Sequence, residues 1–342
     1  MRAVRFHAPG NGLRIEDVPL PQPLGTQVRV RVAGCGVCHT DLHVVDGAQT
    51  RVVPPVTLGH EVAGWVDAYG PEVTGAPPID TPVVVFGGWG CGDCRECRGG
   101  AEQRCVDAVA PGFQADGGYA SALLVPHPRH LVILTGLDPA HAAPLADAGI
   151  TPYRAVTRAD PWLKESARVL VIGCGALGQF ALQYLRLLPA HGSTLAITVR
   201  DRIPARLERA MALGADGVQL ADADEPVTGS FDVAFDFVGS SETLRQATGA
   251  LAPDGLLVLV GEAGADIRFG FEHVPIESWL TTVAWGSAGD LRAVVRLADE
   301  GRITWSTELL PLEDAAESHR RLRAGDVDGR LVLVPQAEGG RA

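Results

Sequence analysis

The sequence predicts an α/β protein in which a β-rich module precedes a doubly wound parallel sheet. Residues 1–130 contain short alternating segments, such as QVRVRV at 27–32, separated by glycine and proline. This pattern is typical of an irregular, mostly β module. From about residue 135, strand-like apolar runs alternate with helix-like stretches, and the first is RVLVI at 168–172. Strands that alternate with crossover helices form parallel sheets.

The second module is predicted to hold six strands and their connecting helices. We expect strands at 168–172, 195–199, 217–220, 231–238, 255–260 and 280–285, and helices at 175–188, 204–213, 241–251 and 288–300. The tail returns to a strand-like pattern at 330–334 and is expected to pack on the first module. The expected domains are therefore residues 1–148 together with 290–342, and residues 149–289.

Composition limits the partners that the protein is expected to have. The chain has 342 residues, 46% of them hydrophobic, and a formal net charge of -12. This charge argues against nucleic acids and anionic membranes as partners. The sequence contains neither a signal-like N-terminal segment nor an apolar run of the roughly 20 residues that a membrane helix needs. We expect a cytoplasmic protein, where a reducing environment favours cysteine thiolates over disulfides.

A glycine-rich motif, GCGALG at 173–178, follows the first predicted strand of the parallel sheet and opens a helix. In this setting Gly173 permits a tight turn, Gly175 lets a pyrophosphate approach the backbone, and Gly178 lets helix and strand pack closely. Ala176 and Leu177 then form the helix N-terminus, which attracts negative charge. The motif predicts a dinucleotide site; the alternative is a tight turn that binds no ligand.

The choice between NAD and NADP depends on the end of the next strand. Asp201 is placed to accept hydrogen bonds from the adenosine ribose, which favours NAD. Arg200 stands beside it, and an arginine there would instead meet the 2′-phosphate of NADP. Val238, at the end of the 231–238 strand, is a further candidate for cofactor contact. NAD is the favoured cofactor and NADP the alternative.

Four cysteines lie within fifteen residues, with the spacing C-x2-C-x2-C-x7-C. Four thiolates complete a tetrahedron around zinc and leave no position open, so such a site stabilises a loop and does no chemistry. The alternatives are disulfides, free thiols or an iron–sulfur cluster. The residues of this predicted structural zinc site are Cys91, Cys94, Cys97 and Cys105.

A second zinc site is predicted from Cys38 and His60. A catalytic zinc needs three protein ligands and one open position, and Asp147, near the expected domain junction, is the candidate third ligand. Glu61 follows His60 directly and is a candidate for occasional ligation. Asp41 is expected to hold the imidazole of His60. Cys38 or His60 alone would be better explained as a buried structural residue, but the joint pattern favours a metal.

These motifs together resemble those of the zinc-dependent medium-chain alcohol dehydrogenases. The segment GHEVAGWVDAYGPEV at 59–73 matches the zinc signature of that family, and the cysteine lobe and the glycine-rich motif follow in the family's order. The resemblance covers essentially the whole chain. It implies a GroES-like catalytic domain, a Rossmann domain that binds NAD, and two zinc ions per chain, one catalytic and one structural.

The resemblance also implies roles for individual residues. Thr40 resembles the hydroxyl that takes the proton of the substrate alcohol, and His43 resembles the end of the relay that delivers it to solvent. Glu61 resembles the carboxylate that switches onto zinc. His39 stands where many members place a basic residue near the cofactor pyrophosphate, and Arg330 resembles the late arginine near the cofactor phosphates.

One position departs from the usual family pattern. Where many members have a cysteine as third ligand, this chain has Asp147, as do some bacterial secondary-alcohol dehydrogenases that it resembles. A carboxylate is a harder ligand than a thiolate but has the same charge, so zinc binding is expected to persist. The alternative is that Asp147 is solvated and the site holds zinc weakly or not at all.

The expected function is the transfer of hydride between an alcohol and NAD, with a secondary, medium-sized and apolar alcohol or the matching ketone as substrate. The alternatives within the fold are polyol, amino-alcohol and aldehyde-oxidising dehydrogenases. An alternative from another class is a non-catalytic redox sensor that binds NAD and zinc. The family also implies a homo-oligomer, either a dimer or a tetramer.

Overall fold

The computed structural model describes residues 1–336 except 50, 189, 191, 222–226 and 228. The chain divides into two compact units: Met1–Ile150 with Gly286–Ala342, and Thr151–Trp285. The expected return of the chain to the first domain at residue 290 is thus corrected to residue 286. The physical reason is that helix α8 (Ala288–Asp299) is one continuous element, capped by Ser287, and belongs wholly to unit 1.

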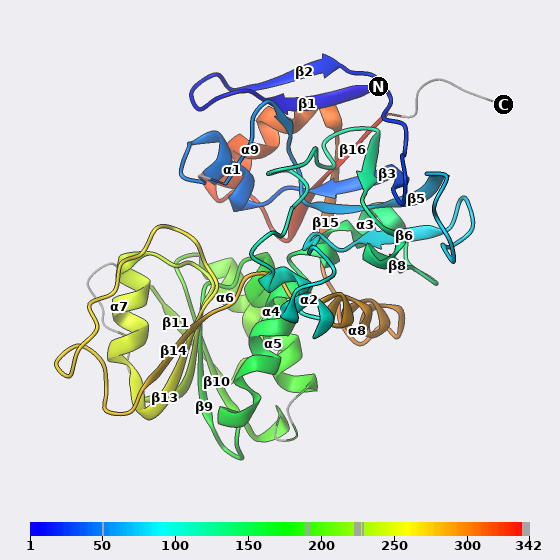
Figure 1. The fold of residues 1–342 in the computed structure, drawn as a ribbon. Coiled ribbons are helices and arrows are strands. Elements are labelled where there is room, and N and C mark those ends of the chain that lie inside the picture. The colour runs from blue at the N-terminus through cyan, green and yellow to red at the C-terminus, as the bar shows by residue number, and fades with distance from the viewer. Residues whose placement is uncertain (50, 189, 191, 222–226, 228, 337–342) are drawn as a thin grey trace. The chain divides into compact units, whose positions relative to one another are not determined.

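Unit 1 is built on a seven-stranded sheet and a separate three-stranded sheet (Figure 1). In the larger sheet the order is β15-β16-β3-β5-β6-β8, and β7 also pairs with β3; the smaller sheet has the order β2-β1-β4. Apart from the parallel pair β15–β16, the pairings in both sheets are antiparallel. The strands are β1 (Arg2–Phe6), β2 (Leu13–Asp17), β3 (Val28–Gly36), β4 (Val56–Thr57), β5 (Glu61–Tyr69), β6 (Pro82–Val85), β7 (Ala122–Val125), β8 (Leu131–Ile133), β15 (Thr307–Pro311) and β16 (Arg330–Val334).

The returning tail completes the larger sheet, because β16 pairs with β3, the strand that leads to Cys38. Unit 1 also contains short helices, which include the 3-10 turns η1 and η3, and the longer helices α8 and α9. Helix α9 packs beside α1, and α8 packs beside β8. These helices are α1 (His39–Val45), α2 (Arg95–Arg98), η1 (Glu102–Arg104), α3 (Pro139–Ala142), η3 (Ala143–Ala146), α8 and α9 (Ala315–Ala324).

Unit 2 is a six-stranded, fully parallel sheet with the order β11-β10-β9-β12-β13-β14 (Figure 1). The chain starts at the centre and winds outward in both directions, which is the doubly wound order of dinucleotide-binding folds. The strands are β9 (Arg168–Ile172), β10 (Ala196–Asp201), β11 (Gly217–Leu220), β12 (Phe231–Asp236), β13 (Leu251–Leu259) and β14 (Trp279–Thr282). The helices are α4 (Ile150–Ala159), α5 (Ala176–Leu187), α6 (Pro204–Ala212) and α7 (Ser241–Gly249).

The central strand β9 explains the continuous apolar run that predicted it. Val169, Leu170 and Val171 are all fully buried, because a central parallel strand is covered on both faces. The predicted doubly wound sheet and the predicted β-rich module are both confirmed. Among the residues that the structure describes, no helix has both the length and the apolar character needed to cross a membrane.

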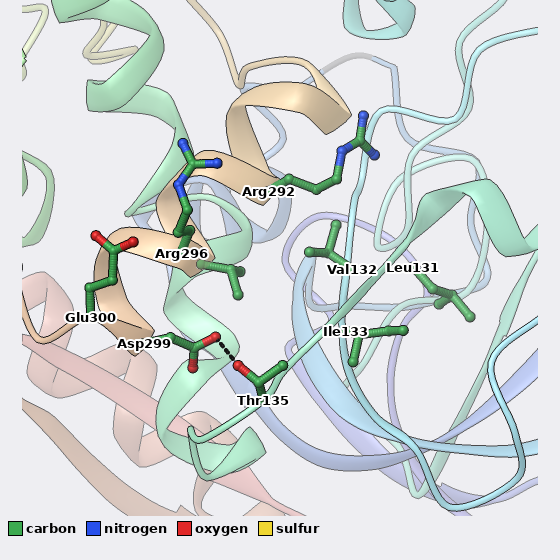
Figure 2. Close-up of a pocket in the computed structure, with 9 residues that line it drawn as sticks. Leu131, Val132, Ile133, Thr135, Arg292, Arg296, Asp299 and Glu300 are labelled. Carbon is green, nitrogen blue, oxygen red and sulfur yellow. Dashed lines mark hydrogen bonds between the residues drawn. The ribbon is translucent and has the colours of Figure 1, made fainter.

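A groove of about 540 Å³ lies in unit 1 between β8 and α8 (Figure 2). The hydroxyl of Thr135 donates a 2.5 Å hydrogen bond to Asp299 at its rim. Two arginines and two carboxylates line the groove together, so its charge does not favour one kind of ion. Its lining residues are Leu131, Val132, Ile133, Thr135, Arg292, Val295, Arg296, Asp299 and Glu300, and the predicted zinc ligands are not among them.

Candidate active site

The candidate catalytic cluster gathers residues from three distant parts of unit 1. Cys38 lies between β3 and α1, His60 directly precedes β5, and Asp147 directly follows η3. The Cys38 Sγ lies 3.6 Å from the Asp147 carboxylate, and the His60 Nε2 lies 3.5 Å from the same oxygen. Cys38 and His60 are buried, with 6% and 2% of their surface exposed.

These separations fit a tetrahedral zinc. Ligand atoms about 2.0–2.3 Å from the ion lie roughly 3.5 Å apart across a tetrahedron, which agrees with the separations in the cluster. The ligand atoms of Cys38, His60, Glu61 and Asp147 all lie within 4.8 Å of one another. The residues expected from the sequence therefore come together in an arrangement that fits the metal.

Glu61 is held beside this cluster by Arg330. The Arg330 Nε donates a 2.8 Å hydrogen bond to one Glu61 oxygen, and its Nη2 pairs with the other. Burial raises the pKa of Glu61 to about 7, against the opposing effect of Arg330. The Arg330 Nη2 also lies 3.6 Å from Asp147. The sequence did not reveal this contact between Arg330 and Glu61. The expected role of Arg330 near the cofactor phosphates stays a prediction.

Asp41 faces the other nitrogen of the predicted zinc ligand His60. Its Oδ1 lies 3.5 Å from the His60 Nδ1, and its Oδ2 accepts a 2.9 Å hydrogen bond from the Cys38 N–H. Burial alone would lower the pKa of His60, but Asp41 and Asp147 outweigh this effect and raise it well above its usual range. The electrostatics thus favour positive charge at the point where Cys38, His60 and Asp147 meet, as a cation site requires.

Helix α1 carries the candidate relay residues. Thr40 and His43 are half-buried and lie three residues apart, which places them on the same face of the helix. The Thr40 Oγ1 lies 3.6 Å from the Cys38 Sγ, so a hydroxyl stands beside the metal cluster. His39 is exposed at the first position of the helix. The relay and pyrophosphate roles of these residues stay predictions.

The four-cysteine lobe forms a second cluster around α2. Cys91, Cys94, Cys97 and Cys105 bring their sulfur atoms within 4.8 Å of one another. The Cys91 and Cys97 sulfur atoms are 3.9 Å apart, close to the roughly 3.8 Å expected for two thiolates on one tetrahedral zinc. Cys91 is exposed, and the backbone N–H groups of Asp93 and Cys94 lower its pKa to about 7, whereas burial raises the pKa of Cys97 to about 12.

The lobe has a polar support that the sequence did not reveal. Glu102 accepts hydrogen bonds from the Gly90 N–H and from the His130 Nε2, both at 3.0 Å. Burial lowers the pKa of His130 to about 4, so this imidazole is neutral and donates through Nε2. Its partner Glu102 lies 28 residues away in the sequence, and no local motif connects the two.

The glycine-rich turn in unit 2 has the shape that a pyrophosphate site requires. Gly173 has a φ of +85°, in the left-handed region that favours glycine. A Cβ at Gly178 would overlap the carbonyl oxygen of Gly173, whereas a Cβ at Gly175 would meet only the tip of Arg206, 3.8 Å away. Helix α5 begins at Ala176, so its N-terminal N–H groups face the open side of the turn.

The carboxyl ends of β10 and β12 border this turn. Asp201 accepts a 2.7 Å hydrogen bond from the Cys174 N–H, and a Cβ at Gly173 would lie 2.9 Å from the Val238 side chain. Arg206, on α6, lies 3.9 Å from Asp201 and is a candidate nucleotide contact that the sequence did not single out. Arg200 is only 2% exposed, and its side chain points to the face of β10 opposite that of Asp201. The role of Arg200 in cofactor binding stays a prediction.

A parallel sheet with a pyrophosphate-shaped first turn, in a chain that also carries an open metal cluster, defines the class of metal-dependent dehydrogenases. Residues 25–135 match the alcohol dehydrogenase GroES-like domain, and residues 213–333 match the zinc-binding dehydrogenase family. The chain belongs to the zinc-binding alcohol dehydrogenase family, as its full-length relatives also show.

Two curated relatives differ in cofactor. The D-arabinose 1-dehydrogenase (NADP(+)) of Saccharolobus solfataricus is 36% identical over 94% of each chain. The NAD-dependent alcohol dehydrogenase of Sulfurisphaera tokodaii is 35% identical, over 98% of this chain and 100% of the relative. Among solved structures, the alcohol dehydrogenase of Aeropyrum pernix superposes with a TM-score of 0.89 at 33% identity, covering 98% of this chain and 100% of the other.

Proposed function

We propose that the protein oxidises secondary, apolar alcohols with NAD and reduces the matching ketones. The observation that carries this proposal is the separation of 3.5–3.6 Å between Asp147 and the ligand atoms of Cys38 and His60, which fits three ligands on one zinc with a fourth position left open. When bound, zinc supplies Lewis acidity and NAD supplies the hydride acceptor. Zinc-binding relatives that use NAD support the assignment.

The roles of the protein's own groups follow from their positions. Cys38, His60 and Asp147 would hold the metal, and Asp41 would hold the His60 imidazole through its Nδ1. The Thr40 Oγ1 would accept the proton of the substrate hydroxyl, and His43, on the same face of α1, would pass it toward solvent. Such a relay serves general base catalysis at a buried site.

Aromatic packing supports an apolar substrate. The ring of Phe113 lies 5.6 Å from the His60 imidazole, centre to centre, so an aromatic surface borders the predicted metal ligand. An aromatic surface at this position favours hydrocarbon substituents over hydroxyl groups.

A sugar or polyol is the second candidate substrate, because one relative of 36% identity is a D-arabinose 1-dehydrogenase that uses NADP. An assay of cofactor reduction with a panel of secondary alcohols, polyols and aldoses, each with NAD and with NADP, decides between the two. The proposal predicts the highest kcat/KM for an apolar secondary alcohol with NAD. Turnover confined to aldoses with NADP would overturn it.

The relay has a test of its own. In the His43→Ala variant, alcohol oxidation should fall most at low pH, where the substrate hydroxyl most needs a proton acceptor. The ratio of variant to wild-type kcat is measured from pH 6 to pH 10. A ratio that is flat across this range would remove His43 from the mechanism.

We also propose a homo-oligomer, in which β14 pairs with a second copy. This strand ends the order of its sheet, and large apolar side chains are exposed in the segment before and within it. Phe269, Phe271, Ile276 and Trp279 are 72%, 97%, 64% and 55% exposed, which is typical of an interaction surface. Light scattering should give a dimer or tetramer, and Phe271→Asp should shift it toward monomer. We further propose a cytoplasmic location, where thiolate ligands stay reduced.

A further inference from the structure

Helix α9 presents a buried histidine to the interior of unit 1, and neither the predicted relay nor the predicted metal ligands use it. His319 is 6% exposed, and its Nε2 lies 3.4 Å from the hydroxyl of Tyr119. The Tyr119 side chain is fully buried. Burying two polar groups of this size costs free energy unless both are hydrogen-bonded, so this contact needs an explanation.

The direction of the hydrogen bonds can be assigned from their surroundings. The Tyr119 hydroxyl lies 3.1 Å from the Asp41 Oδ2 and donates to it. Burial, together with the charge of Asp41, raises the pKa of Tyr119 well above its usual range, so the phenol keeps its proton. Burial likewise lowers the pKa of His319, so its imidazole is neutral and carries one N–H. Tyr119 has already used its proton, and therefore accepts from the His319 Nε2–H.

This chain of hydrogen bonds ends on the carboxylate that faces the predicted zinc ligand. Asp41 accepts from Tyr119 and from the Cys38 N–H, and its other oxygen lies 3.5 Å from the His60 Nδ1. A carboxylate in this position fixes the tautomer and the orientation of a metal-binding imidazole. Its own orientation depends on the donors that hold it.

We propose that His319 is a positioning residue for the catalytic metal, acting through Tyr119 and Asp41 on His60. This inference rests on the proposed metal site. His319 holds the Tyr119 hydroxyl toward Asp41, and Asp41 in turn keeps the His60 Nε2 aimed at Cys38 and Asp147. The C-terminal tail thus contributes to the metal site from a helix that supplies no ligand.

The same helix offers an internal control. Arg323, one turn beyond His319, forms two hydrogen bonds of 2.7 and 2.9 Å with Asp46 at the end of α1. Both partners are about half exposed, and exposed ion pairs contribute little to stability. If α9 acted only by fastening α1 in place, Arg323 would matter as much as His319. If the hydrogen-bond chain matters, only His319 affects the metal.

The test is the rate at which zinc leaves the intact holoprotein to a chromogenic chelator. Two zinc populations are expected, and the Cys38→Ala variant identifies the phase that belongs to the catalytic site. In that phase Tyr119→Phe, which keeps the ring and removes the hydroxyl, should release zinc about 10-fold faster. Removing a group that supports a metal ligand commonly weakens metal binding by at least this factor. His319→Leu should accelerate release roughly 3- to 10-fold.

Three comparisons make the result specific. His319→Gln, which can place an N–H near the same point, should release zinc at close to the wild-type rate, and Arg323→Gln should match wild type. The double variant Tyr119→Phe/His319→Leu should be no faster than Tyr119→Phe, because both changes break one chain. The visible spectrum of the cobalt-substituted catalytic site should shift in His319→Leu and not in Arg323→Gln.

Equal release from His319→Leu and wild type would overturn the proposal. So would additive effects in the double variant, or equal loss in His319→Leu and His319→Gln, which would indicate packing alone. These readouts need no turnover, so they are independent of the substrate. A wild-type protein without the Cys38-dependent phase would overturn both the metal site and this inference, whereas a wild-type phase that His319→Leu leaves unchanged would overturn only the inference.

Discussion

The two metal clusters of unit 1 are built in opposite ways. The four-cysteine lobe takes all its ligands from Cys91–Cys105, a segment of fifteen residues, and Cys91 is exposed. The catalytic cluster joins Cys38, His60 and Asp147 across 109 residues of sequence separation, and Cys38 and His60 are buried. The first cluster organises a loop, whereas the second depends on the completed fold.

This difference explains what each metal can do. A lobe that uses four thiolates has no open position at which a substrate could bind. The catalytic cluster has three predicted ligands, a hydroxyl from Thr40 beside them, and the Glu61–Arg330 pair next to them. We therefore expect damage to the lobe to appear as lost stability, and damage to the catalytic cluster to appear as lost turnover.

The largest effect is expected from Cys38→Ala or His60→Ala. Each should remove one zinc per chain and lower kcat by about 1,000-fold or more, because metal ions contribute several kcal/mol of charge stabilisation to such reactions. Atomic absorption measures the zinc content per chain, and the rate of NADH formation measures kcat. Cys35→Ala, a buried cysteine outside both clusters, is the matched control and should keep both zinc ions. Full activity in Cys38→Ala would erase the distinction between the clusters.

Removing a ligand from the lobe should have a different signature. Cys97→Ala is expected to lose the other zinc and to lower the thermal midpoint by about 10 °C or more, since structural zinc contributes directly to folding free energy. Turnover per folded molecule at low temperature should stay within about threefold of wild type. Calorimetry measures the thermal midpoint, and an assay at 15 °C measures the turnover of the folded protein. A selective loss of turnover with an unchanged midpoint would contradict the assignment of the lobe as structural.

Variants of the Glu61–Arg330 pair test how much this buried ion pair beside the catalytic cluster stabilises the fold. Arg330→Gln leaves a buried carboxylate without its partner and should destabilise the protein by about 3–5 kcal/mol. Urea unfolding followed by fluorescence measures this loss. Adding Glu61→Gln removes the uncompensated charge, so the double variant should recover part of it. A double variant less stable than Arg330→Gln would show that the pair is not the relevant interaction.

The smallest predicted effect concerns the support of the lobe. Unfolded histidine takes up a proton near pH 6.5, whereas the pKa of His130 is lowered to about 4 in the fold. Between these values the unfolded state binds more protons, so the free energy of unfolding falls as pH is lowered from about 6.5 to about 4. The lowered pKa of His130 contributes about 3 kcal/mol at most to this pH dependence.

The measurement is the urea midpoint at pH 7 and at pH 5. His130→Gln can still donate to Glu102 but cannot be protonated in this range, so its midpoint should change less between the two pH values. An equal change in wild type and His130→Gln would assign the pH dependence to other groups, such as the thiolates themselves.

The sequence was most informative where one function lies in one short segment. The lobe and the glycine-rich turn were predicted because their residues act at close spacing, and the structure brings the four sulfur atoms together as expected. The alternation of the strands and the buried run at β9 were enough to predict the doubly wound sheet. Asp147 was named as the third ligand from its place near the expected domain junction, and the family resemblance then matched it to a ligand position.

Contacts between distant residues could not be predicted in this way. Arg330 meets Glu61 across 269 residues, and His319 meets Tyr119 across 200, so no local pattern connects them. Arg200 and Asp201 are adjacent, yet one is a core residue and the other holds the glycine-rich turn. That difference depends on the face of β10 to which each side chain points. An error of one residue in the predicted register would exchange the two faces.

The most direct test of the account is the reversible removal of the catalytic zinc. Zinc is withdrawn until one ion per chain remains, the Cys38-dependent site is confirmed as the emptied one, and NADH formation from a secondary alcohol is measured before and after zinc is restored. The account predicts that turnover disappears with that ion and returns in proportion to its reoccupation. Unchanged turnover with the Cys38–His60–Asp147 site empty would contradict it.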